Sequence, residues 1–218
     1  MIFLVMAISY LIGSIPFGYV VVRTFSGRDV RQVGSGRTGG TNAMRAAGLP
    51  AGLLTAVLDA LKAAVCVWLA RFILPTDTQA IGMVLAGLFA IVGHNYSIFL
   101  RFKGGAGGAP TVGGALAIWP WSFVIAVPLC MGVLFGIGYA SLATIAAGVI
   151  ITVLFAYRAY AQQAPAEFIL YGFGACVLLV WSLRPNIRRL LHGEERLIGW
   201  RAKRLKKTNA EDSATKGR

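Results

Sequence analysis

A run of glycine, hydroxyl and arginine residues follows the first apolar segment of the chain. The run is VGSGRTGGTN, residues 33–42, and it contains Gly34, Ser35, Gly36 and Arg37. Closely spaced glycines allow backbone amides to converge on an anion, and hydroxyl and guanidinium groups add further donors. These residue types are typical of a phosphate-binding loop. A flexible loop whose arginines only contact lipid headgroups is the alternative.

The residues that follow predict a short helix with its N-terminus directed at the same anion. We expect Thr41 or Asn42 to cap a helix over residues 42–47, and Gly48 to end it. The unpaired amides of a helix N-terminus attract negative charge. Arg45 lies within this helix and adds a full positive charge. Thr41, Asn42 and Arg45 are therefore candidate phosphate-binding residues.

A second glycine cluster lies further along the chain. It is FKGGAGGAP, residues 102–110, and it supplies Lys103, Gly104, Gly105 and Gly107. A tight turn between two helices is the alternative interpretation. Two glycine-rich loops on one predicted membrane face, each next to basic residues, favour a single shared phosphate site.

Two charged residues lie inside an apolar segment, LLTAVLDALKAAV. Asp59 and Lys62 are three residues apart, so they share one helical face and can pair. Charged residues at membrane depth are costly and usually face the protein interior or a wet cavity. We favour a structural ion pair over a direct chemical role.

No metal or cofactor site is predicted. The three cysteines lie in apolar runs without C-x-x-C spacing or a nearby histidine, which is typical of small buried side chains. The chain has no G-x-S-x-G sequence, and the two histidines lack evident carboxylate and serine partners for a catalytic triad. We therefore expect His94 to be structural and His192 to lie at the surface.

The composition is that of a polytopic membrane protein. Of the 218 residues 57% are hydrophobic and only 13% are charged, which is too apolar for a soluble core to cover. The net charge of +13 comes from short basic segments beside apolar runs, so positive-inside topology explains it better than nucleic-acid binding. We expect residues 1–207 to form one integral membrane domain and the polar residues 208–218 a disordered tail.

Charge between the apolar runs predicts the orientation in the membrane. Residues 23–50, 101–110 and 184–207 are rich in Lys and Arg, whereas residues 75–79 have neither. The positive-inside rule places the basic segments and the C-terminus in the cytoplasm and the N-terminus outside. The runs themselves cover about residues 2–22, 51–74, 80–100, 111–136, 137–157 and 165–183.

Opposite termini require an odd number of crossings, yet there are six apolar runs. The run 111–136 is the one we expect to be broken, because it contains Trp119-Pro120-Trp121, and proline removes a backbone donor. A broken run gives about seven transmembrane helical elements. Five longer crossings are the alternative.

Several segments occur in an order typical of one enzyme family. They are GSIPFGYVVVR (13–23), DVRQVGSGRTGGTNAMRAAG (29–48), DALK (59–62), GHNYSIFLRFKGGAGGAPTVGG (93–114) and NIRRLLHGEE (186–195). Together they resemble the bacterial acyl-phosphate:glycerol-3-phosphate acyltransferases over nearly the whole chain to about residue 200. The resemblance implies an enzyme that makes lysophosphatidic acid from acyl phosphate and glycerol 3-phosphate.

The resemblance also implies roles for individual residues. Ser35 is expected to bind phosphate or polarise the acyl group, Arg45 to hold the glycerol phosphate, and Asn186 to contact bound substrate. Lys103 and the amides of the second glycine loop complete the phosphate site. The loop glycines concerned are Gly104, Gly105 and Gly107.

The chain departs from the family pattern at cationic positions. Ala106 stands where the family has a lysine, and Leu183 where it has a histidine, while Arg37 replaces an asparagine. Arg37 or Arg184 could compensate for the two missing cations. The alternative is a divergent lipid-phosphate-binding paralogue with little or no activity.

The expected reaction needs no cofactor and takes place at the cytoplasmic face of the bacterial inner membrane. Its partners would be the two anionic substrates, membrane lipid and a soluble enzyme that makes acyl phosphate. A transporter of an anionic metabolite, based on Asp59, Lys62 and the broken helix, is a third and weaker hypothesis.

Overall fold

The described part of the chain is helical, as the composition predicts. The structure is a computed structural model that describes residues 1–198 and Ala202. Over these residues it has helices, short 3-10 turns and one isolated bridge between Tyr139 and Leu197, but no strand. The tail predicted over residues 208–218 lies outside the described residues. The helices are α1 (Ile2–Ser14), α2 (Phe17–Ser26), α3 (Gly40–Ile73), α4 (Thr76–Asn95), α5 (Gly108–Ile118), α6 (Trp121–Ile137), α7 (Ala140–Tyr160), α8 (Glu167–Ser182) and α9 (Arg184–Leu191).

Among the described residues, four helical stretches are long and apolar enough to cross a membrane. They are Ile2–Ser26, Gly40–Ile73, Thr76–Leu100 and Ala140–Tyr160. Helices α8 and α9, which bend by 63° at the residue between them, make a fifth if they count as one span. A polytopic integral membrane fold is therefore confirmed.

The apolar run 111–136 is broken at the predicted place. Helix α5 ends at Ile118, Trp119 is extended with φ −149° and ψ 108°, and α6 begins at Trp121. Pro120 has no amide hydrogen for a continuous helix, so the chain restarts there. The 11 residues of α5 span about 16 Å, which is shorter than a bilayer core of about 30 Å.

The first apolar run is also interrupted, which the sequence analysis did not predict. Helix α1 ends before Ile15 and Pro16, and α2 restarts at Phe17. The break releases the Ile15 carbonyl oxygen, which accepts a hydrogen bond of 2.8 Å from Lys62 Nζ. The predicted pair is formed as well, with Lys62 Nζ 2.7 Å from Asp59 Oδ1.

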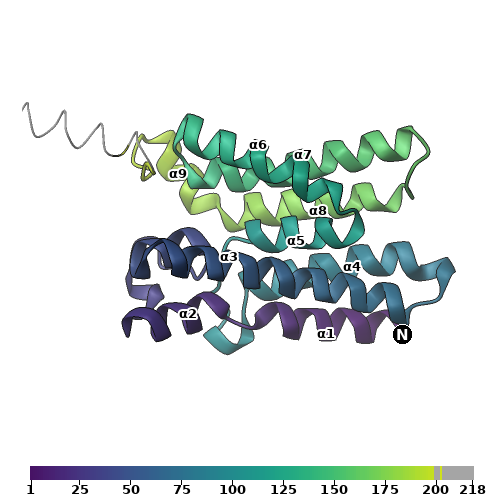
Figure 1. Cartoon of the computed structure of the whole chain (residues 1–218), viewed down its shortest axis with the longest axis horizontal. Helices are drawn as coiled ribbons and strands as arrows, with labels where there is room; N and C mark the ends of the chain where they lie inside the picture. Colours follow the sequence, from purple (N-terminus) through teal and green to yellow (C-terminus); the bar gives the residue numbers. More distant parts are fainter. Residues whose placement is uncertain (199–201, 203–218) are drawn as a thin grey trace, which may run out of the picture.

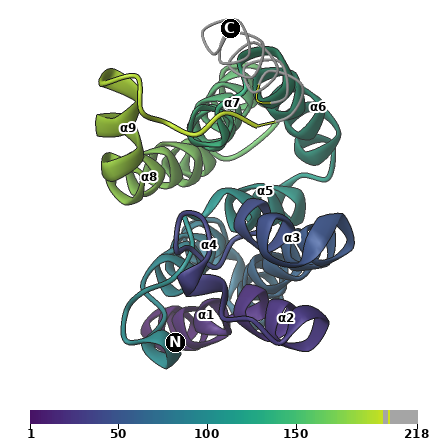
Figure 2. The same ribbon diagram turned by 90° about the vertical axis from the view of Figure 1, so that its left-hand side faces the viewer.

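The helices form two groups with α5 between them (Figures 1 and 2). Helices α1 to α4 make one group and α6 to α8 the other, and α5 packs extensively against α3. Small residues permit this packing: a methyl group on Gly113 of α5 would overlap the backbone of Ala60 in α3. The connections that carry the predicted site, residues 27–39 and 101–107, lie in the half of the bundle that carries α9, away from the N-terminus (Figure 1).

Candidate active site

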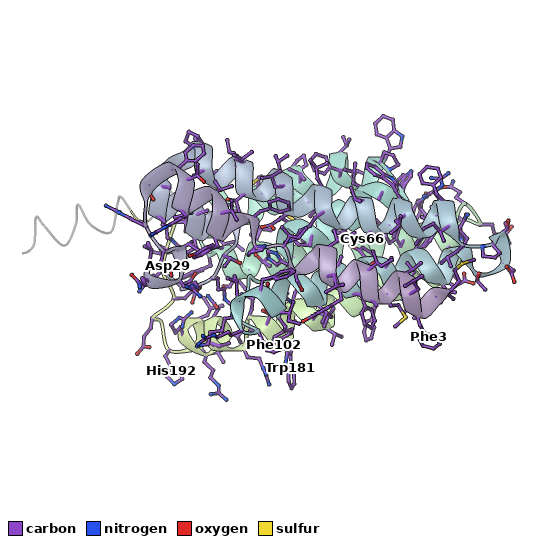
Figure 3. The ribbon with its side chains drawn as sticks, turned by 90° about the horizontal axis from the view of Figure 1, so that it is seen from below. Phe3, Asp29, Cys66, Phe102, Trp181 and His192 are labelled. Atoms are coloured by element: carbon purple, nitrogen blue, oxygen red, sulfur yellow. The ribbon has the colours of Figure 1, made fainter. Side chains whose placement is uncertain are left out.

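A pocket of about 720 Å³ opens at the end of the molecule that carries the glycine loops. Three chain segments form it: the first glycine loop, the segment from α4 to the second glycine loop, and the junction of α8 with α9. In Figure 3 the pocket residues Phe102 and Trp181 lie side by side along the lower edge, between His192 and Phe3 and nearer to His192. The cationic residues that line the pocket are Arg37, Lys103, Arg184, Arg188 and Arg189.

The structure brings most of the predicted site residues to this pocket. Ser35, Gly36, Arg37, Lys103, Gly104, Gly105 and Asn186 line it. The remaining candidates are not among the lining residues. They are Gly34, Thr41, Asn42, Arg45 and Gly107.

Asn42 organises the first glycine loop from behind. Its side chain is buried, and its Oδ1 accepts a hydrogen bond of 3.1 Å from the amide of Ser35. Its Nδ2 donates to the carbonyl oxygens of Val30, Val33 and Arg37 at 2.8–3.0 Å. The prediction that Thr41 or Asn42 caps the next helix is wrong, because Gly39 is the N-cap residue and no side chain caps α3. The predicted end of that short helix at Gly48 is marked by a kink with φ 87°.

Arg37 joins three segments of the pocket. Its Nη1 donates to the Gly105 carbonyl at 3.1 Å and to Ser182 Oγ at 3.0 Å, and its Nη2 donates to the Ser182 carbonyl. Partial burial lowers the pKa of the Arg37 guanidinium, and repulsion by Arg189 adds to this effect. The side chain thus connects the two glycine loops to the end of α8. It remains positively charged near neutral pH, because a guanidinium group does not lose its proton in proteins.

The second glycine loop packs closely on the end of α4. The amides of Gly104 and Gly105 donate to the Asn95 and His94 carbonyls at 3.1 and 3.0 Å. They are therefore not free to bind phosphate, which corrects the expectation that these amides form a cradle. Glycine is needed for a different reason, since a methyl group on Gly105 would overlap the His94 imidazole. The hydrogen bond of 3.4 Å from the Thr38 amide to the Gly104 carbonyl joins this loop to the first.

Asp59, Lys62 and His94 form a buried polar cluster that packs against the second glycine loop through His94. His94 Nδ1 lies 3.1 Å from Lys62 Nζ and 3.3 Å from Asp59 Oδ1. The imidazole is buried and its other edge faces Gly105. The three side chains do not line the pocket, so they lie where a supporting role is expected rather than contact with a substrate.

A carboxylate binds two polar groups at the opposite wall of the pocket. Glu195 Oε1 accepts a hydrogen bond of 2.8 Å from Asn186 Nδ2, and Oε2 lies 3.3 Å from Arg189 Nε. The Glu195 side chain is only 6% exposed. Arg45 also interacts electrostatically with Glu195, and its Cδ would lie 3.3 Å from a methyl group on Gly34. Glu195 thus fixes Asn186 and Arg189 of α9 at the pocket, and its negative charge favours the Arg45 cation of α3.

Comparison with known proteins identifies the family. The family described as glycerol-3-phosphate acyltransferase matches residues 3–193. The chain belongs to the glycerol-3-phosphate acyltransferase family. It is 40% identical over 203 residues to "Glycerol-3-phosphate acyltransferase 2" of Moorella thermoacetica, covering 91% of this chain and 98% of the relative. It is 37% identical to the glycerol-3-phosphate acyltransferase of Staphylococcus haemolyticus, covering 92% and 99%.

Two solved structures of the acyltransferase PlsY (YgiH) have the same fold. One is the glycerol 3-phosphate form of this integral membrane protein, with a TM-score of 0.79 and 32% identity over 91% of this chain and 96% of that one. The other is its lysophosphatidic acid form, with a TM-score of 0.78 and 30% identity over 91% and 95%. The suspected family, the enzyme class and the membrane fold are confirmed.

Neither of the two positions at which the chain lacks a family cation lies on the pocket wall. Ala106 is half-buried next to the lining glycines, and the Leu183 side chain is buried. A histidine at position 183 would need room for a polar ring in that interior. The five cationic side chains of the pocket remain in place around these two positions.

The pocket residues that were not predicted from the sequence are Arg188 and Arg189 of α9. Arg184, which was predicted as a compensating cation, also lines the pocket and stacks over Trp181 at 3.3 Å from the ring centroid. The run NIRRLL indicated the family and the membrane orientation, but nothing in it distinguished Arg188 and Arg189 as pocket residues. Over residues 1–198 and Ala202, no group of three or more His, Cys, Asp or Glu side chains is arranged to hold a metal ion.

Proposed function

We propose that this acyltransferase moves a fatty acyl group from acyl phosphate to carbon 1 of glycerol 3-phosphate. The products are lysophosphatidic acid and inorganic phosphate. The observation that carries the proposal is the pocket with five cationic side chains at one end of an apolar helix bundle. Both substrates carry phosphate and one carries a fatty chain, so a cationic pocket next to lipid suits both.

The proposed reaction breaks the mixed-anhydride bond of the acyl phosphate and forms a carboxylic ester. The hydroxyl oxygen on carbon 1 attacks the acyl carbonyl carbon, and the bond from that carbon to the phosphate oxygen breaks. Phosphate leaves with the electron pair, and the hydroxyl proton passes to a phosphate oxygen. Because phosphate is a good leaving group, positioning and electrostatic stabilisation can supply most of the rate without a protein nucleophile.

We assign the binding roles to groups on three segments. Ser35 polarises the acyl group or binds its phosphate, Arg45 holds the glycerol phosphate, and Asn186 contacts bound substrate. Arg37 and Lys103 bind phosphate from the two loops, with Arg184, Arg188 and Arg189 as further cations. The short distance between Arg37 and the Gly105 carbonyl supports the view that both loops serve one site.

We propose seven passages through the bacterial inner membrane by one domain, residues 1–207, with the N-terminus outside. The support is the position of the basic loops and α9 at the end of the bundle away from the N-terminus (Figure 1). In this arrangement α5 is a short passage and the pocket faces the cytoplasm. A soluble enzyme that makes acyl phosphate would then deliver the donor from that side.

The direct test uses purified protein in lipid with palmitoyl phosphate and labelled glycerol 3-phosphate. We expect lysophosphatidic acid to form, and the Ser35→Ala and Arg45→Ala variants to lose most of the activity. Unchanged turnover in both variants would remove those two roles. Turnover that appears only in the Ala106→Lys variant would favour a divergent paralogue. The observation that motivates this alternative is the missing lysine at position 106.

A further inference from the structure

One buried polar side chain at the pocket has no hydrogen-bond partner within the part of the chain that the structure describes. Asn95, the last residue of α4, lines the pocket and is 4% exposed. Neither its Oδ1 nor its Nδ2 has a partner among the described residues. The sequence analysis gave Asn95 no role, and the proposed function does not use it.

The Asn95 carboxamide lies directly behind the second glycine loop. The backbone carbonyl of Asn95 accepts a hydrogen bond of 3.1 Å from the Gly104 amide. The side-chain Oδ1 of Asn95 would lie 2.9 Å from a methyl group on Gly107. The amide therefore packs against the second glycine loop at the edge of the pocket that Asn95 lines.

A buried amide without partners costs free energy, and native proteins rarely retain one without a reason. The other asparagine beneath a glycine loop shows the usual outcome, since Asn42 bonds through both ends of its amide. Asn95 differs from Asn42 in lining the pocket. A ligand in that pocket is thus the partner that fits both observations.

The chemistry of an amide selects which part of a ligand it binds. Oδ1 needs a hydrogen-bond donor, and Nδ2 needs an acceptor. A phosphate dianion offers only acceptors, and so does an acyl phosphate. A hydroxyl group both donates and accepts a hydrogen bond. An alcohol can therefore serve as partner to both Oδ1 and Nδ2, whereas a phosphate dianion or an acyl phosphate leaves Oδ1 without a donor.

We infer that Asn95 binds the hydroxyl group on carbon 2 of glycerol 3-phosphate and so selects this acceptor. The hydroxyl on carbon 1 must give up its proton during the reaction, and an amide is no base for it. The hydroxyl on carbon 2 keeps its proton and can stay bound throughout. This inference rests on the proposed function.

The test compares glycerol 3-phosphate with 3-hydroxypropyl phosphate, which lacks only the hydroxyl on carbon 2. In the native protein we expect kcat/KM to be about tenfold higher for glycerol 3-phosphate, as for the loss of one buried hydrogen bond. In Asn95→Ala and Asn95→Leu we expect this ratio to fall to about one, while KM for palmitoyl phosphate changes less than about twofold. A general loss of structure would lower kcat/KM for both acceptors alike and leave the ratio of the two values unchanged.

Lys103→Ala is the matched control from the same loop. Its cation serves the phosphate that both acceptors share, so their rates should fall together and the tenfold ratio should remain. A ratio that persists in both Asn95 variants, or a native protein that does not distinguish the two acceptors, overturns the inference.

Binding affinities of the same two phosphates, measured by calorimetry on the native protein and the variants, provide a second readout without turnover. Absence of turnover in the native protein would reject the proposed function. The affinity ratio would still decide the role of Asn95, because it needs only the acceptor to bind.

Discussion

Two glycine-rich loops meet at the pocket, and each packs against an asparagine. Asn42 contacts the first loop and Asn95 the second. The first, residues 33–39, is tied to Asn42 through three hydrogen bonds, and a fourth joins Asn42 to the Val30 carbonyl just before the loop. The second, residues 103–107, is held by its own backbone, with two amides bonded to the end of α4. Asn95 beneath it has an amide without partners among the described residues.

The difference shows two ways to position a loop for a charged substrate. The first loop is fixed by a side chain that satisfies several carbonyl and amide groups at once. The second is fixed by close contact, for which the absence of side chains at Gly104 and Gly105 is the requirement. A mutation should therefore harm the first loop by removing atoms and the second by adding them.

The largest effect is expected when an atom is added to the second loop. In Gly105→Ala the new methyl group would overlap the His94 imidazole, which is buried and cannot move freely. The loop would have to shift, and displacements of about 1 Å in a positioned site can cost about 100-fold in rate. We expect the rate of lysophosphatidic acid formation to fall by at least about 100-fold.

Gly39→Ala is the control for this experiment in the first loop. No atom lies within 4 Å of the position that its methyl group would take, and its backbone φ of −76° suits any residue. We expect less than about a threefold change in rate. Equal losses in both variants would show that glycine flexibility, and not close contact, governs the second loop.

Removal of atoms should affect the two asparagines differently. Asn42→Ala loses four hydrogen bonds, which we expect to reduce the free energy of unfolding in mixed micelles by about 2–4 kcal/mol. Asn95→Ala loses none that the described residues form, so we expect a change within about 0.5 kcal/mol. A similar destabilisation in both variants would mean that the amide of Asn95 is bonded in the folded protein.

The link between the loops is the next target. Arg37→Ala removes the hydrogen bonds to the Gly105 carbonyl and to Ser182, together with one cation of the pocket. We expect kcat/KM for glycerol 3-phosphate to fall by about tenfold, and Arg37→Lys to recover only part of it because lysine lacks the planar fork. Arg28→Ala, an exposed arginine outside the pocket, should change kcat/KM by less than about twofold.

Local signals in the sequence predicted much of this arrangement. Glycines beside arginines indicated both loops, the spacing of Asp59 and Lys62 indicated their ion pair, and Pro120 indicated the break before α6. Each of these depends on the chemistry of neighbouring residues. Pro16 likewise marks the break between α1 and α2. We did not predict that break, because the apolar run on both sides of Pro16 is long enough for one continuous membrane helix.

Contacts between distant segments could not be predicted in this way. The bond from Asn186 to Glu195 follows from the turn after α9, and the place of Asn95 behind Gly107 follows from how the loop folds back on α4. The expectation of a backbone cradle was wrong for Gly104 and Gly105 because the end of α4 offers unpaired carbonyls that use those amides first. The sequence shows which groups are present but not which of them are already bonded.

The smallest expected effect concerns the outer support of the first loop. Asp29 accepts hydrogen bonds from the Arg31 amide and guanidinium at the turn before the loop, and this contact lowers the pKa of the Asp29 carboxyl. A lowered pKa in the folded state stabilises the protein above the unfolded pKa of about 4, and this contribution is lost as the pH falls through the folded pKa. The Arg31 side chain is 40% exposed, so solvent screens the pair and Asp29→Asn should cost less than about 0.5 kcal/mol at pH 7.

The pH dependence tests whether the ion pair is the cause of that small cost. The difference in unfolding free energy between the native protein and Asp29→Asn should shrink as the pH falls from 7 to about 3, because the native carboxyl then becomes neutral as well. A difference above about 1 kcal/mol, or one that grows on acidification, would contradict this. The first loop would then depend on its outer turn as strongly as on Asn42, and the contrast between a loop held by one side chain and a loop held by close contact would no longer describe the site.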